Sequence, residues 1–461
     1  MVSANTRSLR RAVLHHFRRT AVTPPWVAAR LAVTLARRRA SQQHPGAART
    51  MTTATTQQLL TKLRLEIPIL GAPMAGAGDA TMAAAVARAG ALASLPCAAW
   101  SLERARHEMT ALREALGDDR PFNVNFFCHA PPEDVAADRA DRWATRLATL
   151  RSAYGLGDDD ELTGWSDAGP KRGAFDDAAS LLCRRPALVS SALCDVGNRC
   201  RLVEELRPGA VSFHFGLPEP ALLGRVKSTG AVVLASATTV REATWLEANG
   251  ADVIIAQGSE AGGHRSNFLG PKDPSDVASQ IGTFALVPMV VDAVSVPVVA
   301  AGGISDGRGV LAALALGADA VQVGSAYLRA TESRIPAYHK AALDAAESDS
   351  TTLTNVFSGR PARSVVNEAV RTLGPINFDA PPFPTAPPYL TAIKKAADAK
   401  GRLGEVSSLW SGQAATLAPP TSDQRSVTDI TRAMWADSRS VLEQLHARAA
   451  PGRSPNEDGD V

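Results

Sequence analysis

The sequence lacks several features that mark particular classes of protein. Only 5% of its 461 residues are Phe, Trp or Tyr, which argues against an aromatic platform for nucleic-acid bases. No run of about 18 apolar residues occurs, so no membrane-spanning helix is predicted. The five cysteines form no Cys-x-x-Cys pair, which argues against structural zinc and a disulfide framework. We therefore expect a cytoplasmic protein that has no metal site and binds neither nucleic acid nor membrane.

Acidic residues are absent from the start of the chain. Residues 1–50 contain ten arginines and no Asp or Glu, which leaves 39 basic and 46 acidic residues elsewhere, a balance of −7. This mildly acidic body implies no polyanionic partner. An Arg-rich, amphipathic leader is typical of a mitochondrial transit peptide, which would make the protein mitochondrial. A disordered tail, or sequence upstream of a true start at Met51, explains the same composition.

From Ile67 onward, eight short apolar runs alternate with amphipathic segments. The runs are IPILGAPM, ALASLP, FNVNFF, AVSFHFG, AVVLASA, DVIIAQG, PVVAAGG and DAVQVGS. Nearly continuous apolar strands are typical of parallel sheets buried on both faces. Eight successive β–α units predict an α/β fold, a (β/α)8 TIM barrel. An open doubly wound sheet is the alternative, because a sequence does not show closure.

The regular spacing of strands breaks twice. An insertion is predicted after the third strand, at residues 128–208, with a helix in PPEDVAADRADRWATRLATLRSAYGL, a loop in DAGPKRGAF and a helix in NRCRLVEELRPG. A helical extension follows the last strand, and such long excursions often form lids. The predicted parts are a leader (1–50), a barrel (55–330), an extension packed on the barrel mouth (331–448) and a disordered tail (449–461).

Polar side chains and glycines crowd the C-terminal ends of the predicted strands, where the active sites of such barrels lie. The residues at these ends are Met74, Leu95, Asn125, His214, Ser236, Gln257, Gly303 and Gly324. Because the starts of the strands carry nothing comparable, this ring is the predicted active site.

Two glycine turns follow the last two strands. Gly302 and Gly303 end the seventh run, and Gly324 with Ser325 ends the eighth. Without a Cβ, backbone N–H groups can approach a phosphate closely, and barrels commonly hold a phosphate between these two loops. We therefore predict a phosphate site here, although glycines in tight turns alone would give the same sequence.

The segment QGSEAGGHR after the sixth strand carries the most chemistry. Gln257 can donate and accept hydrogen bonds at a heteroaromatic edge, and Gly262 leaves room for that edge beside the chain. His264, with its near-neutral pKa, is suited to accept a proton. The alternatives are a loop histidine bonded to a carbonyl for His264, a core histidine for His214, and a turn cap for Asn125.

Seven motifs occur together and in order: APMAGA, NVNFF, SFHFG, AQGSEAGGHR, AAGGISDGRG, QVGSAYL and GRPARSVVN. Over residues 55–430 the sequence resembles the nitronate monooxygenase family, formerly called 2-nitropropane dioxygenases, in its bacterial-type class I. The resemblance implies an FMN-dependent barrel that oxidises alkyl nitronates with O2 to a carbonyl compound and nitrite. It also implies propionate 3-nitronate as the substrate.

The same resemblance implies roles for particular residues. His264 matches the base that deprotonates a neutral nitroalkane, and His214 matches a second histidine that contacts the nitro group. The implied cofactor contacts are Met74, Asn125, Gln257, Gly262, Gly303, Gln322, Val323, Gly324 and Ser325, with Gly302 added from its glycine turn. Family active sites also use several tyrosines and a lysine, but none of the four tyrosines here matches them.

Two other functions fit the same FMN motifs. One is an FMN-dependent NAD(P)H reductase, like enoyl-acyl carrier protein or quinone reductases; SFHFG and GRPAR favour the monooxygenase instead. The other is a flavin-binding protein without turnover, against which the presence of both His214 and His264 argues. We expect a monomer or a homodimer.

Overall fold

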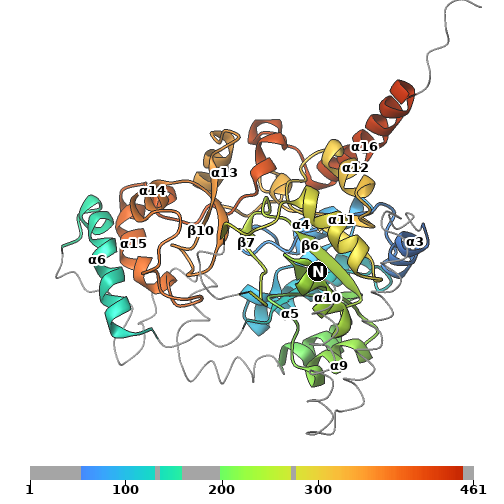
Figure 1. Ribbon diagram of the computed structural model, residues 1–461, viewed down its shortest axis with the longest axis horizontal. Helices are drawn as coiled ribbons and strands as arrows, with labels where there is room; N and C mark the ends of the chain where they lie inside the picture. The colour runs from blue at the N-terminus through green and yellow to red at the C-terminus, as the bar shows by residue number, and fades with distance from the viewer. Residues whose placement is uncertain (1–52, 130–134, 158–197, 271–276, 450–461) are drawn as a thin grey trace, which may run out of the picture. The chain divides into compact units, whose positions relative to one another are not determined.

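Eight short parallel strands form the centre of the structure (Figure 1). They are β1 (Ile69–Gly71), β2 (Ser94–Leu95), β3 (Asn123–Phe127), β4 (Ala210–His214), β5 (Val232–Ala237), β6 (Val253–Gln257), β8 (Val298–Ala301) and β9 (Ala320–Val323). Their order in the sheet is β1-β9-β8-β6-β5-β4-β3-β2. A parallel bridge between Leu70 and Leu92 brings the two ends of the sheet together. The sheet is therefore a nearly closed, TIM-like barrel, which confirms the predicted barrel and not the open sheet.

The computed structural model describes residues 53–129, 135–157, 198–270 and 277–449. The predicted leader, the DAGPKRGAF loop and the last dozen residues lie outside these ranges. Residues 51–461 make up one unit by their contacts. None of the helices in the described ranges is long and apolar enough to cross a membrane.

Helices alternate with the strands along the chain, as the amphipathic segments predicted. They are α3 (Thr53–Lys62), α4 (Ala80–Arg88), α5 (Leu102–Leu116), α9 (Pro220–Ser228), α10 (Val240–Ala248), α11 (Thr283–Ala293), α12 (Gly307–Ala315) and the C-terminal α16 (Val427–Ala449). Several start at a side chain that accepts a backbone N–H, such as Asp79 at α4 and Thr239 at α10. A cap of this kind stabilises a helix by about 1 kcal/mol.

Alternate residues of the strands face the barrel interior and the surrounding helices. Leu234 and Ile255 pack in the interior with Leu59 of α3 and with Leu63, which directly follows this helix. Their neighbours Ala235 and Ile254 pack in a second cluster, with side chains of the helices α10 and α11. Because both faces of each strand are covered, the strands read as continuous apolar runs.

The C-terminal extension contains strands as well as helices, which sequence analysis missed. β10 (Thr351–Thr354) pairs antiparallel with β11 (Ala362–Val365). β11 pairs in turn with β7 (Gly263–His264), which directly follows the loop after β6. This small sheet ties the extension to the rim of the barrel. The helices of the extension before α16 are α13 (Ala337–Asp344), α14 (Glu368–Leu373) and α15 (Thr391–Ala399), and 3-10 turns over Pro387–Leu390, Leu403–Glu405, Gln413–Leu417 and Thr421–Asp423 connect them.

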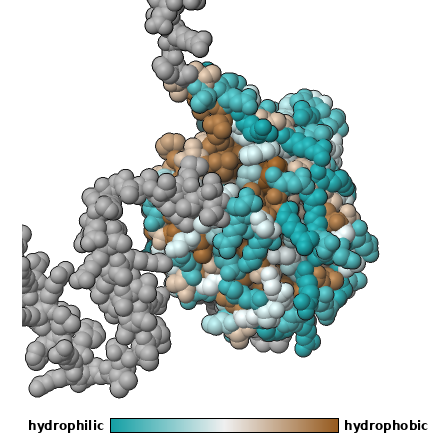
Figure 2. All heavy atoms as spheres, turned by 90° about the vertical axis from the view of Figure 1, so that its right-hand side faces the viewer, coloured by the Kyte–Doolittle hydropathy of each residue, from teal (hydrophilic) through white to brown (hydrophobic). Residues whose placement is uncertain are grey.

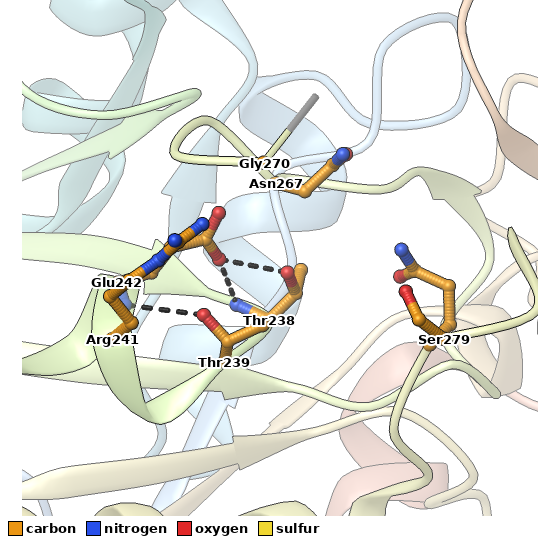
Figure 3. A pocket seen from close by; sticks show the side chains of 8 residues that line it. Thr238, Thr239, Arg241, Glu242, Asn267, Gly270 and Ser279 are labelled. Carbon is orange, nitrogen blue, oxygen red and sulfur yellow. Dashed lines mark hydrogen bonds between the residues drawn. The ribbon is translucent and has the colours of Figure 1, made fainter. Parts of the chain in front are cut away.

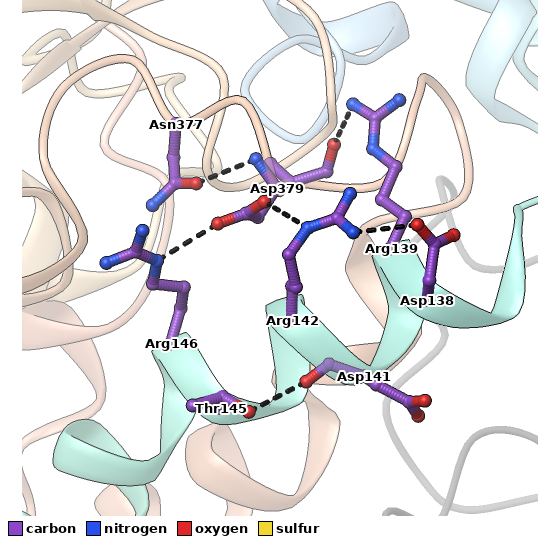
Figure 4. Close-up of polar contacts among 9 residues, drawn as sticks. Asp138, Arg139, Asp141, Arg142, Thr145, Arg146, Asn377 and Asp379 are labelled. Carbon is purple, nitrogen blue, oxygen red and sulfur yellow. Dashed lines mark hydrogen bonds and ion pairs between the residues drawn. The ribbon is translucent and has the colours of Figure 1, made fainter.

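The insertion after β3 joins this extension. Its helix α6 (Ala137–Ala153) lies beside α15 in Figure 1, and the helix predicted near its end covers residues 198–206. Trp143, Leu147 and Leu150 of α6 pack into one apolar cluster with side chains of α14 and α15. At the surface of the same contact, the Asp379 carboxylate accepts hydrogen bonds from Arg142 Nε at 2.8 Å and Arg146 Nε at 3.0 Å (Figure 4). Two segments far apart in sequence thus share a satellite core.

Hydrophilic side chains predominate on the face of the molecule drawn in Figure 2. Hydrophobic residues gather there beneath the projecting end of α16. Along α16 itself, Leu442 and Leu445 are about half exposed, at 55% and 50%.

Replacing Trp143 tests the satellite core. Its side chain is fully buried and its indole Nε1 has no hydrogen-bond partner in the described part of the chain, so Trp143→Ala removes packing without breaking a hydrogen bond seen there. We expect the free energy of unfolding in urea to fall by about 3–5 kcal/mol. The control, Leu442→Ala on the exposed face of α16, should change it by less than about 0.5 kcal/mol. Equal small effects of both substitutions would contradict this packing.

Candidate active site

The loop after β6 is held by side chains of two barrel strands. Gln257 Nε2 donates to the carbonyl of His264 at 3.1 Å, and Gln257 Oε1 accepts from the N–H of Ser266 at 2.9 Å. His214 Nε2 lies 3.2 Å from the same carbonyl of His264. Because a carbonyl oxygen only accepts, His214 carries its proton on Nε2. Gln257, predicted to face a ring edge, uses both ends of its amide to fix the loop.

The imidazole of His264 faces the extension. Its Nε2 lies 2.9 Å from Ser358 Oγ, which in turn donates to the carbonyl of Arg360 at 3.2 Å. The hydroxyl proton is therefore used, so His264 donates from Nε2 and its Nδ1 keeps the lone pair. The ring packs against Phe383 and Trp410, with centroids 5.3 and 5.4 Å away.

Burial controls the charge of these histidines. Burial, with a smaller contribution from Arg360, lowers the pKa of His264 to about 3. Burial, followed by the nearby His264, lowers the pKa of His214 to about 3 as well. Both side chains are neutral at physiological pH, and only a neutral imidazole can accept a proton.

Phe215 has a strained backbone at the end of β4. Its φ is 70°, in the left-handed region that bulky residues rarely adopt. Such a conformation costs on the order of 1–3 kcal/mol and tends to occur at functional sites. The guanidinium of Arg360 lies 4.0 Å from the centre of the Phe215 ring. In the sequence, Arg360 stood out only as a letter of the GRPARSVVN motif and Ser358 not at all, because nothing local reveals their partners.

A polar cluster lies on the neighbouring strand β3. Asn125 Nδ2 donates to Ser212 Oγ at 3.0 Å, which leaves Asn125 Oδ1 without a partner in the described ranges. Asn123 Nδ2 donates to Ser94 Oγ and Ser212 Oγ, both at 3.0 Å, while its buried Oδ1 has no partner. Asn123 was not singled out from the sequence, although it stands two residues before Asn125 and therefore points the same way.

The two glycine turns present free backbone donors. Gly302 and Gly303 have φ values of 114° and 71°, which only glycine adopts readily. Within the part of the chain that the structure describes, the N–H groups of Gly302, Gly303 and Gly324 have no hydrogen-bond partner. Unpaired backbone N–H groups fit an anionic group such as a phosphate. In the first turn of α12, the N–H of Gly309 already donates to the Asp306 carboxylate, so this donor is not available to a phosphate.

A segment missed in the sequence lies against the second glycine turn. The N–H of Gly412 donates to Ser325 Oγ at 2.7 Å, and the N–H of Gln413 donates to the carbonyl of Glu260 at 3.0 Å. A Cβ on Gly262 would stand 2.5 Å from the nitrogen of Gly412. Gly262 is therefore required by the close approach of the extension. The remaining predicted residues flank this turn, with Gln322 and Val323 at the end of β9 and the Met74 sulfur 3.6 Å from a Cβ placed on Gly324.

A small polar cavity of about 210 Å³ lies apart from the predicted site residues. It is lined by Thr238, Thr239, Arg241, Glu242, Asn267, Gly270, Ser279 and Gln280 (Figure 3). Glu242 Oε2 accepts from the N–H and hydroxyl of Thr238, both at 2.8 Å. These two hydrogen bonds occupy Glu242 Oε2 and fix the residue that directly follows β5.

No tyrosine contacts His264 among the described residues. The hydroxyl of Tyr327 is buried and bonded to Thr431 at 2.8 Å, and that of Tyr154 donates to Glu405 at 2.7 Å. Tyr389 packs on the satellite core and Tyr338 lies beside Gly404. Phenylalanine and tryptophan rings surround the histidine instead.

A parallel barrel with polar side chains and unpaired N–H groups at the ends of its strands has the architecture of an α/β-barrel enzyme. The family model described as nitronate monooxygenase matches residues 57–433, so the chain belongs to the nitronate monooxygenase family. It is therefore an oxidoreductase of a flavin-dependent family.

Similar proteins support this membership. A nitronate monooxygenase of Paraburkholderia phytofirmans is 38% identical over 390 residues, covering 84% of this chain and 96% of that protein. One of Pseudomonas aeruginosa is 38% identical over 373 residues, 79% of this chain and 95% of its own. The solved nitroalkane oxidase of Streptomyces ansochromogenes is 34% identical, has a TM-score of 0.67 and covers 83% of this chain and 99% of its own. FabK of Thermotoga maritima, at 24% identity, TM-score 0.57, 85% of this chain and 98% of its own, shares the fold.

Two glycine substitutions separate backbone strain from flavin binding. Gly303→Ala places a side chain at φ +71°, and the control Gly230→Ala does so at φ +85° in a turn with open space around it. Both should lose about 1–2 kcal/mol of stability. Because relaxation of φ redirects the N–H groups of its turn, only Gly303→Ala should weaken flavin binding, by about tenfold or more. The flavin content of the purified variants measures this. Equal flavin content in both would contradict a phosphate site at Gly303.

Proposed function

We propose that the protein is an FMN-dependent nitronate monooxygenase that converts alkyl nitronates and O2 to a carbonyl compound and nitrite. We propose propionate 3-nitronate as its substrate. The observation that carries this proposal is the neutral His264, with Nδ1 free, at a barrel rim that also offers two unpaired N–H turns.

The rim residues fit FMN. The N–H groups of Gly302, Gly303 and Gly324 would hold its phosphate, and Met74 and Asn125 Oδ1 would meet its ring system. No Gly-x-Gly-x-x-Gly turn with a following acidic residue occurs after a strand, which favours a mononucleotide. When bound, FMN supplies the transfer of electrons from the nitronate to O2.

The protein itself handles the proton. His264 Nδ1 accepts the proton from the carbon next to the nitro group when the substrate is a neutral nitroalkane, and Ser358 fixes the ring for this transfer. A preformed nitronate has already lost that proton and does not need the base. His214 donates to the carbonyl of His264, so its free nitrogen in the neutral form is an acceptor. We therefore assign His214 to positioning the loop in place of the nitro contact that the family resemblance implied.

Removal of the base distinguishes these two substrate forms. His264→Asn should lower the rate with neutral nitroethane by about 10²- to 10⁴-fold and leave the rate with preformed ethyl nitronate within about threefold. Nitrite release measures both. His107→Asn, at an exposed position on α5, is the matched control and should change neither rate. An equal loss on both substrates would remove His264 from the role of base.

The rival reductase function is tested without oxygen. If the protein is a monooxygenase, NADH should leave the flavin oxidised, whereas propionate 3-nitronate should bleach it. Rapid bleaching by NADH would support the reductase, and no bleaching by either compound would support a flavin-binding protein without turnover. A cytoplasmic location, a monomeric or homodimeric state and the sequence-derived domain boundaries stay predictions.

A further inference from the structure

Two buried arginines and one part-buried arginine near the candidate site have no carboxylate partner in the described ranges. Among the described residues, Arg265, Arg360 and Arg363 form no ion pair, and most of their hydrogen bonds go to backbone carbonyls. The nearest acids, Glu242 and Glu260, are bonded to backbone N–H groups and threonine hydroxyls. Buried charges are normally paired, so the rim carries an excess of positive charge.

Arg360 is the arginine that faces the histidines. Its guanidinium lies 4.0 Å from the centre of the Phe215 ring, and the rings of His129, His214 and His264 pack against the same ring with centroids 6.1, 4.5 and 6.2 Å away. Its Nε donates to the carbonyl of Arg265 and its Nη2 to that of Asn267. Its Nη1 has no partner among the described residues and is free to bind a ligand.

His129, at the end of the segment after β3, has no role in the proposed reaction. Its Nδ1 is buried and has no hydrogen-bond partner among the residues that the structure describes. The ring packs edge-on against Phe383 at 5.0 Å and Phe215 at 6.1 Å. His264 packs against the same two rings, at 5.3 and 6.2 Å. His129, His264 and Arg360 therefore converge on one aromatic wall.

We propose that Arg360 Nη1 and His129 Nδ1–H form an anion subsite beside His264. In this subsite they bind the carboxylate of a nitronate that carries a carboxylate at the other end of its chain. The proposal rests on the nitronate monooxygenase function. Two donors, one of them charged, match the two oxygens of a carboxylate. The bound carboxylate also supplies the anion that the Arg360 guanidinium lacks, and none of the described tyrosines contacts His264 to bind it instead.

A pair of nitronates of equal carbon number tests the subsite. Propionate 3-nitronate carries the carboxylate, and propyl-1-nitronate does not. In Arg360→Met, which keeps much of the side-chain packing, the KM for propionate 3-nitronate should rise about 10- to 100-fold. The KM for propyl-1-nitronate should stay within about threefold. Arg104→Met, which removes a guanidinium 5.0 Å from the Trp100 ring on the outer helix α5, is the control and should change neither.

Arg360 also donates to two loop carbonyls, so Arg360→Met could raise the KM by disturbing the loop. A second variant, which leaves those two hydrogen bonds intact, separates this effect from loss of the subsite. His129→Phe breaks no hydrogen bond at Nδ1, and it should raise the KM for propionate 3-nitronate alone by at least about fivefold. Calorimetric binding of 3-nitropropionate, compared with 1-nitropropane, should show the same selectivity without turnover.

Two results overturn the proposal in distinguishable ways. If the wild type turns over both nitronates and the two variants affect them equally or not at all, the subsite is wrong and the proposed function stands. If the wild type turns over neither nitronate, the proposed function fails, and the subsite fails with it.

Discussion

The pairing of Gly263 and His264 with Ala362 and Arg363 is the contact on which the candidate site depends. A barrel alone would leave the loop after β6 as a free excursion. Pairing with β11 fixes its backbone, and the N–H of Arg265 extends the contact to the carbonyl of Pro361 at 2.9 Å. The same strand of the extension is preceded by Ser358 and Arg360, so one backbone contact brings His264, its hydrogen-bond partner and a cation together. The extension therefore contributes residues to the candidate site.

Electrostatics at this rim follow from burial. The apolar wall of Phe215, Phe383 and Trp410 disfavours the charged form of the imidazoles, while arginines held by backbone carbonyls stay charged. A neutral base next to a fixed positive charge suits a substrate that becomes an anion on losing its proton. The left-handed backbone conformation of Phe215 is unfavourable by itself, and the surrounding contacts stabilise it.

The barrel could be predicted from the sequence because its signal is local: each strand is a continuous apolar run, and the turns after β8 and β9 carry their glycines. The small sheet could not, because β7 has two residues and gains its partner only from about 100 positions downstream. Position along the chain placed His264 and His214 on the rim. Three other features depend on tertiary contacts that the sequence does not show. The tautomer of His264 depends on Ser358, the role of Gln257 in the loop depends on Ser266, and the requirement for glycine at position 262 depends on Gly412.

The most direct test of this account is a crystal structure of the protein from Met51 onward, purified with its flavin. The account predicts FMN across the barrel rim, its phosphate bonded to the N–H groups of Gly303 and Gly324, and the His264 imidazole at the open face of the flavin ring with Nδ1 toward the bound substrate. A phosphate held elsewhere, or an imidazole turned away from the flavin, would contradict it.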